Sequence, residues 1–190
     1  EYNIALPYNL KAIKYAEAIP GVDKAGLGGQ WLNAGTLYNL MGDFKNAMSC
    51  NLKALTKFEE AGNKRGESFC YTNMSGIYIS LGQLSRALQT AEKSLGLKRE
   101  LNDVRGSCTS LQNIGMAYMK MQNFPLAMKN YEAALQVALS EDLPSQELNC
   151  YFNMGKIYGE QKQDSIAIEY YKKSRAIAVA LESKSMVANA

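Results

Sequence analysis

The groups in this sequence that could carry acid–base or nucleophilic chemistry are carboxylates, lysines, tyrosines and four cysteines, because the 190 residues include no histidine. The chain therefore lacks the usual general base at neutral pH and every Ser/His or Cys/His pair. Cys50, Cys70, Cys108 and Cys150 form no CxxC pair, so the common zinc spacings are absent. We expect no metal, no other cofactor and no enzyme activity. We also expect reduced core thiols with no disulfide among them.

Asparagine is the polar residue whose spacing is regular. Asn33, Asn73, Asn113 and Asn153 follow one another at intervals of forty residues. Each amide offers both a hydrogen-bond donor and an acceptor, which suits the backbone of an extended peptide. Asparagine is mildly unfavourable inside a helix, so four of them need a reason. Two interpretations stay open: the asparagines form a ladder that faces a ligand, or they cap and brace neighbouring helices and touch no ligand.

A forty-residue repeat contains these asparagines and predicts the elements that hold them. Three further columns recur in register, namely a small residue (Gly35, Ser75, Gly115, Gly155), a tyrosine (Tyr38, Tyr78, Tyr118, Tyr158) and an alanine (Ala47, Ala87, Ala127, Ala167). Within each repeat the apolar and small residues are spaced by three and four, which predicts two amphipathic helices and no strand. Gly, Asn and Asp place the hairpin turns at 41–44, 81–84, 121–124 and 162–165.

The small and alanine columns predict where the two helices of each repeat touch. Glycine inside a helix is destabilising by about 1 kcal/mol relative to alanine, and a close approach of the second helix supplies the reason for it. Tyrosine rings would pack between helices and send their hydroxyls to the edge. Pro125 and Pro144 suit the first turn of a helix. Trp31 is expected to pack against the preceding half repeat rather than to anchor a ligand.

The repeat pattern is small-x-x-Tyr-x-x-x-Gly-x-(Phe/Leu)-x-x-Ala, with a further small residue seven positions on (Ala54, Ser94, Ala134, Ser174). It resembles the tetratricopeptide repeat, whose usual period is about 34 residues. The forty-residue variant is similar to the repeats of G-protein-signalling modulator (Pins-like) proteins, to those of bacterial sensor kinases and regulators, and less so to kinesin light chain. Lys162 and Asp164 depart from the pattern in the fourth repeat, so its hairpin is expected to be looser.

The resemblance implies an all-α, right-handed superhelical solenoid of antiparallel helix hairpins. We expect a single solenoid over residues 1–190, with a half repeat at 1–20, repeats at about 24–62, 64–102, 104–142 and 145–182, and the start of a further helix at 184–190. Each repeat needs neighbours to bury its faces. The chain is therefore expected to be a piece of a larger protein, and exposed terminal repeats could support end-to-end self-association.

The resemblance also implies that the first helix of each hairpin lines a concave groove for a peptide. The implied groove residues are Asn33, Asn73, Asn113, Asn153, Phe69, Thr72, Gln112, Met116, Met119, Phe152 and Lys156. The asparagines would hold the peptide backbone, and pockets around the Phe and Met residues would give specificity. Only Lys120 and Lys156 could add positive charge there. The basic clamp of adaptors that bind acidic chaperone tails is missing, which disfavours that role.

The overall charge is nearly balanced. Lys plus Arg exceed Asp plus Glu by three, and charged residues make up 21% of the chain. This argues against a nucleic-acid partner, which usually requires a basic stripe. No apolar run approaches the roughly 20 residues that span a bilayer, so we expect no membrane insertion in this segment. Unpaired cysteines favour the reducing cytoplasm, with a bacterial periplasmic sensor region left open.

These observations favour a protein-interaction scaffold or sensory module that receives a peptide or a partner helix and belongs to a larger signalling or regulatory protein. The alternative is a regulatory repeat domain that senses a peptide or small ligand. A pocket closed at one end would favour the alternative, and an open groove would favour the scaffold.

Overall fold

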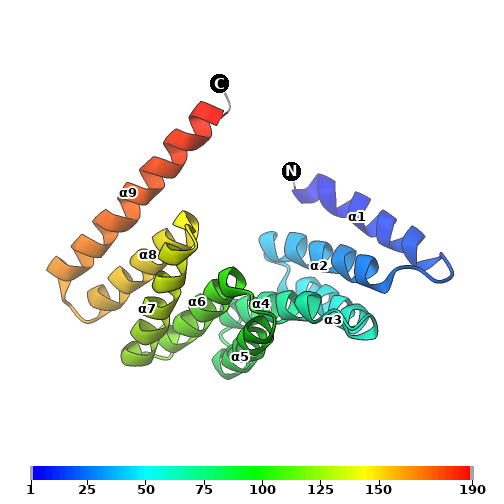
Figure 1. Cartoon of the computed structure of the whole chain (residues 1–190), viewed down its shortest axis with the longest axis horizontal. Helices are drawn as coiled ribbons and strands as arrows, with labels where there is room; N and C mark the ends of the chain where they lie inside the picture. The colour runs from blue at the N-terminus through cyan, green and yellow to red at the C-terminus, as the bar shows by residue number, and fades with distance from the viewer. Residues whose placement is uncertain (1, 189–190) are drawn as a thin grey trace. The chain divides into compact units, whose positions relative to one another are not determined.

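The computed structural model describes the backbone of residues 2–188 and the side chains of residues 4–182. Over this range the chain folds into nine helices and no strand (Figure 1). The helices are α1 (Tyr2–Glu17), α2 (Lys24–Leu40), α3 (Phe44–Glu60), α4 (Lys64–Ser80), α5 (Leu84–Glu100), α6 (Val104–Lys120), α7 (Phe124–Ser140), α8 (Pro144–Glu160) and α9 (Asp164–Ala188). The all-α class predicted from the sequence is confirmed.

Contacts divide the chain into two compact units, unit 1 over Glu1–Asn102 and unit 2 over Asp103–Ala190. Unit 1 holds α1 to α5 and unit 2 holds α6 to α9. In unit 1, α2 pairs with α3 and α4 with α5; in unit 2, α6 pairs with α7 and α8 with α9. The first helices of successive hairpins also touch inside each unit, α2 with α4 and α6 with α8. Each unit therefore presents two adjacent first helices.

The four hairpin turns lie where the sequence predicted them and share one backbone conformation. Their left-handed residues are Gly42, Gly82, Gln122 and Lys162, with φ angles of 76°, 71°, 60° and 59°. In each turn the next backbone N–H donates to the carbonyl of the tyrosine column at 2.9 Å. The expectation of a looser fourth hairpin is therefore wrong, because the turn at Lys162 closes with the same hydrogen bond as the turns at glycine.

From Gly42 on, the residue after each left-handed position directly precedes the next helix, and several of these residues cap that helix with a short polar side chain. Asp43 accepts from the backbone N–H of Asn46 at 3.1 Å, and this bond holds the pKa of the Asp43 carboxyl below its usual value. Asn63, Asp103 and Asn123 accept in the same way from the backbone three residues on. Such caps satisfy backbone donors that have no partner inside the helix.

The two helices of a hairpin approach each other at the small and alanine columns, as the sequence predicted. A Cβ added to Gly35 would lie 3.3 Å from the carbonyl oxygen of Ala47. In the next repeat, Ser75 occupies the same column and its hydroxyl donates to the carbonyl of Ala87 at 3.0 Å. The alanine column is buried in all four repeats. A larger side chain at the small position would push the second helix away.

Trp31 belongs to the core at the start of unit 1. Its ring is 8% exposed and lies in a cluster with Leu6 and Ile13 of α1. The indole Nε1 donates to Glu17 at 3.3 Å, and the ammonium of Lys53 lies 4.0 Å from the ring centroid. The interpretation of Trp31 as a packing residue against the preceding half repeat is confirmed.

The end of the chain differs from the sequence expectation. α9 runs without a break from Asp164 to Ala188, so no separate helix begins at residue 184. Residues 189 and 190 of that expected helix lie outside the described residues. No described helix is both long and apolar enough to cross a membrane.

All four cysteines are buried and carry no disulfide in the described structure. Burial raises the pKa of the Cys70 thiol to about 12. Cys150 occupies the same repeat position in unit 2, and a hydrogen bond with Cys108, followed by burial, raises its pKa. The thiols of Cys70 and Cys150 therefore stay protonated at neutral pH.

Candidate functional site

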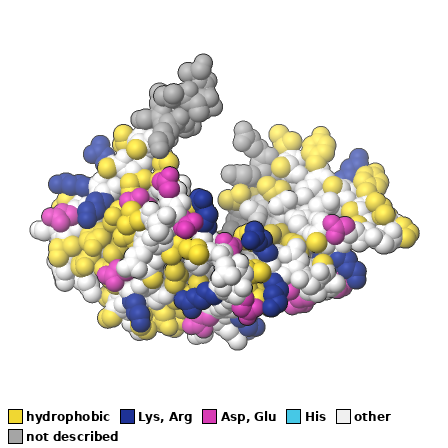
Figure 2. Space-filling view, in the orientation of Figure 1, with side chains coloured by type: hydrophobic (Ala, Val, Ile, Leu, Met, Phe, Trp, Pro, Cys, Tyr) yellow, Lys and Arg dark blue, Asp and Glu magenta, His cyan; other side chains and the backbone are white. Residues whose placement is uncertain are grey.

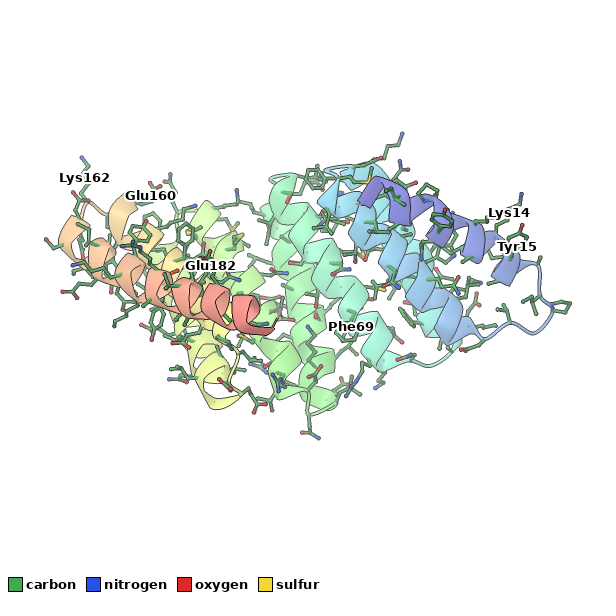
Figure 3. The ribbon with its side chains drawn as sticks, turned by 90° about the horizontal axis from the view of Figure 1, so that it is seen from above. Lys14, Tyr15, Phe69, Glu160, Lys162 and Glu182 are labelled. Carbon is green, nitrogen blue, oxygen red and sulfur yellow. The ribbon has the colours of Figure 1, made fainter. Side chains whose placement is uncertain are left out.

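In unit 1 the candidate surface is formed by the exposed faces of α2 and α4. Asn33 is exposed, whereas Asn73 is half-buried and its Nδ2 donates to the hydroxyl of Thr36 on α2 at 3.4 Å. Phe69 lies one helical turn before Asn73 and is 42% exposed (Figure 3). Because residues four apart share a helix face, an aromatic ring and an amide stand side by side on α4.

Thr72, predicted to face a ligand, takes part in contacts inside unit 1. Its hydroxyl donates to the carbonyl of Ser68 at 2.9 Å and lies 2.7 Å from the Ser94 hydroxyl on α5. Nζ of Lys98, a lysine that is only 1% exposed, donates to the same oxygen at 2.8 Å. Thr72 therefore joins α4 to α5 through a buried polar network.

In unit 2 the candidate surface is formed by α6 and α8, and two of its predicted residues are engaged internally. Nε2 of Gln112 donates to the carbonyl of Gln146 at 2.8 Å and lies 3.1 Å from Sγ of Cys150. Asn153 is 8% exposed, and its Nδ2 donates to the carbonyl of Asn149 at 2.8 Å. Gln112 ties α6 to α8, and Asn153 bonds to the preceding turn of its own helix.

Other predicted residues of unit 2 reach the surface. Phe152 is 47% exposed, and its ring centroid lies 5.7 Å from that of Tyr171 on α9. Asn113 is half-buried. Met116 and Met119 are partly buried against the core cluster of unit 2. The surface therefore combines exposed aromatic rings with sulfur side chains that are anchored in the core.

A hollow of about 220 Å³ lies where α6 and α8 end. Its lining consists of Met119, Lys120, Gln122, Phe124, Lys156 and Glu160. Sequence reasoning identified Met119 and Lys156 as groove residues and Lys120 as a source of charge, but it missed the other three. Gln122 belongs to the turn between α6 and α7, and Phe124 begins α7. The sequence signal that could have identified them is that this turn directly follows the end of the first helix. We call this feature the α6/α8 hollow.

The described residues hold no candidate metal site. No three His, Cys, Asp or Glu side chains among them are placed to hold a metal ion.

Figure 2 shows Lys and Arg side chains scattered among hydrophobic and acidic ones on the face turned to the viewer, without a large area of one sign. The face seen in Figure 2 therefore carries no concentrated field of one sign.

Two family models match the sequence, and both describe the tetratricopeptide repeat. One matches residues 107–178 and the other residues 70–101. Neither distinguishes the Pins-like repeats from others, so that finer resemblance stays a prediction. No curated protein matches the sequence.

Several solved structures share the fold. The Rap conjugation gene regulator of the plasmid pLS20, in complex with the Phr* peptide, has a TM-score of 0.83 at 14% identity, over 95% of this chain and 50% of that one. Aspartyl phosphate phosphatase F from Bacillus subtilis gives 0.83 at 17% identity, over 96% of this chain and 47% of that one. BtubC (BKLC) from P. vanneervenii gives 0.78 at 19% identity, over 95% and 74%.

At these identities the likeness shows the fold alone. The chain spans about half the length of the Rap regulator and of the phosphatase. One of these neighbours is named as an enzyme, so the fold by itself does not decide between a scaffold and a catalyst.

Proposed function

Because the chain belongs to the tetratricopeptide repeat family, whose members are generally non-catalytic scaffolds, we propose that it binds a peptide or a partner helix on the exposed faces of its first helices. The proposed contact residues are Asn33, Asn73, Asn113, Phe69, Met116, Met119, Phe152 and Lys156. Three predicted groove residues would support these surfaces without contacting the ligand, because their side chains form hydrogen bonds within the protein: Thr72, Gln112 and Asn153.

The observation that carries this proposal is the exposure of an aromatic ring on a first helix of each unit. Phe69 on α4 is 42% exposed and Phe152 on α8 is 47% exposed. Phe69 lies beside the amide of Asn73. Buried aromatic anchors dominate the energy of protein interfaces, and an adjacent amide can bond to a peptide backbone. A ring and an amide on one face suit a ligand with both apolar side chains and free backbone groups.

Two features favour a peptide over a small molecule. The Rap regulator with the same fold is described in complex with a peptide, which supports a ligand of this kind here. The α6/α8 hollow, at about 220 Å³, is smaller than the pockets of about 300–1,000 Å³ that hold drug-sized ligands. At this hollow a small-ligand sensor is therefore the weaker alternative, although other hollows on the described surface are larger, such as one of about 440 Å³ lined by Gly82 to Arg86. Membership of a larger signalling or regulatory protein is part of the same proposal.

The test replaces the asparagines of unit 1 and measures binding and stability separately. Extended peptides are selected on the intact chain from a random library, and their affinity is measured by titration. Asn33→Ala with Asn73→Ala should weaken binding by roughly 1–3 kcal/mol, or about 5- to 150-fold, because each lost amide removes about 0.5–1.5 kcal/mol. Stability should change by no more than about 0.5 kcal/mol per site, since neither amide is deeply buried.

Two controls accompany this double variant. Gln89→Ala with Gln136→Ala removes exposed amides from the second helices α5 and α7 and should leave binding unchanged. Asn153→Ala should lower stability by about 1 kcal/mol, because its amide is buried and hydrogen-bonded. Normal binding by a destabilised Asn33→Ala, Asn73→Ala protein would show that these asparagines brace the helices instead.

A further inference from the structure

The α6/α8 hollow is built from the ends of two first helices and one turn. Lys120 is the last residue of α6, and Lys156 lies one turn before Glu160, the last residue of α8. Gln122 occupies the left-handed position of the turn, and Phe124 begins α7. Figure 3 shows Glu160 at the end of α8, where the chain turns into α9. Secondary structure therefore fixes every backbone segment that lines the hollow.

The floor of the hollow is apolar and rests on the core. Met119 and Phe124 are half-buried and pack against a cluster that includes the buried Ala127 and Tyr131. The available volume is about 220 Å³. This volume suits one or two side chains rather than a whole ligand. Methylene groups of an entering side chain would lie against the floor.

The rim of the hollow carries two lysines and one glutamate, all exposed. Within the described part of the chain, neither Lys120 nor Lys156 forms an ion pair, and Glu160 forms none either. The rim is therefore positive by one charge, with both ammonium groups available to an incoming anion. Hydrogen bonds between an ammonium group and a carboxylate are stronger than those between neutral groups.

The same register in unit 1 lacks this charge. Eighty residues earlier, the two lysines and the glutamate correspond to Leu40, Gly76 and Ser80. The repeat itself therefore does not require charge at these positions. The lysines of unit 2 are a local addition to a surface that is neutral in unit 1.

From this geometry we propose that the α6/α8 hollow is a subsite for one acidic side chain, Asp or Glu, of the peptide that the chain binds. Lys120 and Lys156 hold the carboxylate, and Met119 and Phe124 receive the methylene groups next to it. Glu160 reduces the net positive charge of the rim to one, so the preference for an acidic over a basic side chain comes from the two lysines. The subsite rests on the proposed function, since it specifies one position of the same peptide ligand.

The experiment selects peptides from a random library on the intact chain and then exchanges single residues in them. Selected peptides should share an Asp or Glu at one position, and its change to Asn or Gln should weaken binding about tenfold or more. In the Lys120→Gln, Lys156→Gln variant the acidic and amide peptides should bind with equal affinity. The matched control, Lys129→Gln with Lys172→Gln, makes the same charge change on exposed residues of the second helices α7 and α9 and should keep the preference.

The outcomes separate the subsite from the proposed function. Peptides that bind without any shared acidic position, or an acidic preference that survives in the Lys120→Gln, Lys156→Gln variant, overturn the subsite and leave peptide binding intact. A preference lost equally in the control variant shows an effect of net charge and also overturns it. Selection of no peptide at all overturns the proposed function, and the subsite with it.

Discussion

Unit 1 and unit 2 share one repeat register but fill the space opposite the small residue of the first helix differently. The facing residue of the second helix is Asn51 or Ala91 in unit 1 and Tyr131 or Tyr171 in unit 2. A Cβ on Gly115 would lie 3.2 Å from the Tyr131 ring. Glycine there makes room for a ring, whereas Gly35 in unit 1 faces backbone and a short amide. The small column therefore predicts that two helices touch, but not what fills the contact.

The turns change in the same direction along the chain. Up to residue 82 every left-handed position is glycine, at Gly21, Gly42, Gly62 and Gly82; from residue 102 none is, at Asn102, Gln122, Asp142 and Lys162. A left-handed conformation is unfavourable by roughly 1–2 kcal/mol for a residue with a Cβ. The later turns therefore keep the same backbone conformation at an energetic cost, which the packing of their helices must offset.

The largest expected effect follows from the ring that unit 2 buries. Tyr131→Ala should destabilise the protein by about 3–5 kcal/mol, because the 0% exposed ring leaves a cavity between α6 and α7. The matched variant Tyr171→Ala, at the same column but 36% exposed, should lose less than half as much. Urea unfolding measures both. Equal losses would show that the column, and not the depth of burial, determines the contribution of the ring.

The hairpins and turns could be predicted from the sequence because their signals are local. Columns of small, tyrosine and alanine residues give the helix faces, and turn residues give the ends. The sequence also predicted a break in the helix before residue 184, and the structure has none there. The residue at the left-handed turn position explains the difference. The position of Gly62, Asn102 and Asp142 is occupied by Glu182, a good helix former, and α9 continues to Ala188.

The candidate site could be predicted less well than the fold. The helix face on which a polar side chain lies does not determine its hydrogen-bond partner. Thr72 and Gln112 occupy one column, yet the first bonds to Ser94 in the second helix and the second to Gln146 in the next repeat. Their partners lie 22 and 34 residues on, and no periodic pattern identifies them. The α6/α8 hollow likewise depends on where a turn carries Phe124 relative to the ends of two helices.

A smaller effect is expected from exchanging the turns of the two units. Lys162→Gly and Gln122→Gly should each stabilise the protein by about 0.5–1 kcal/mol, since relief of left-handed strain exceeds the added freedom of the unfolded chain. Gly42→Ala and Gly82→Ala should each destabilise it by about 1 kcal/mol, through backbone strain alone, because a Cβ at either site would meet nothing within 4 Å. Thermal and urea unfolding of the four variants check this. If Gly82→Ala stabilised the protein, backbone strain would not be what distinguishes the glycine turns from the turns at Gln122 and Lys162.

The smallest effect concerns two buried polar atoms in the column that distinguishes the units. The Tyr131 hydroxyl and the Oδ1 atom of Asn51 have no hydrogen-bond partner among the described residues. Burial raises the pKa of Tyr131, so the hydroxyl stays protonated through the neutral range. An unsatisfied buried group is unfavourable by about 1–3 kcal/mol, and removal of the hydroxyl leaves the ring in place. Tyr131→Phe should therefore stabilise the protein by up to about 1 kcal/mol.

Asn51→Ala is the counterpart in unit 1 and should change stability little. The variant removes the unpaired oxygen, but it also loses the bond from Nδ2 to the Ala47 carbonyl at 2.8 Å, and these two effects oppose each other. The residue it introduces already occupies this column at Ala91, so the helices can pack around it. Urea unfolding of both variants gives the difference. A Tyr131→Phe protein less stable than the original by more than about 0.5 kcal/mol would mean that the hydroxyl has a partner, and the unpaired polar atom would then be a feature of unit 1 alone.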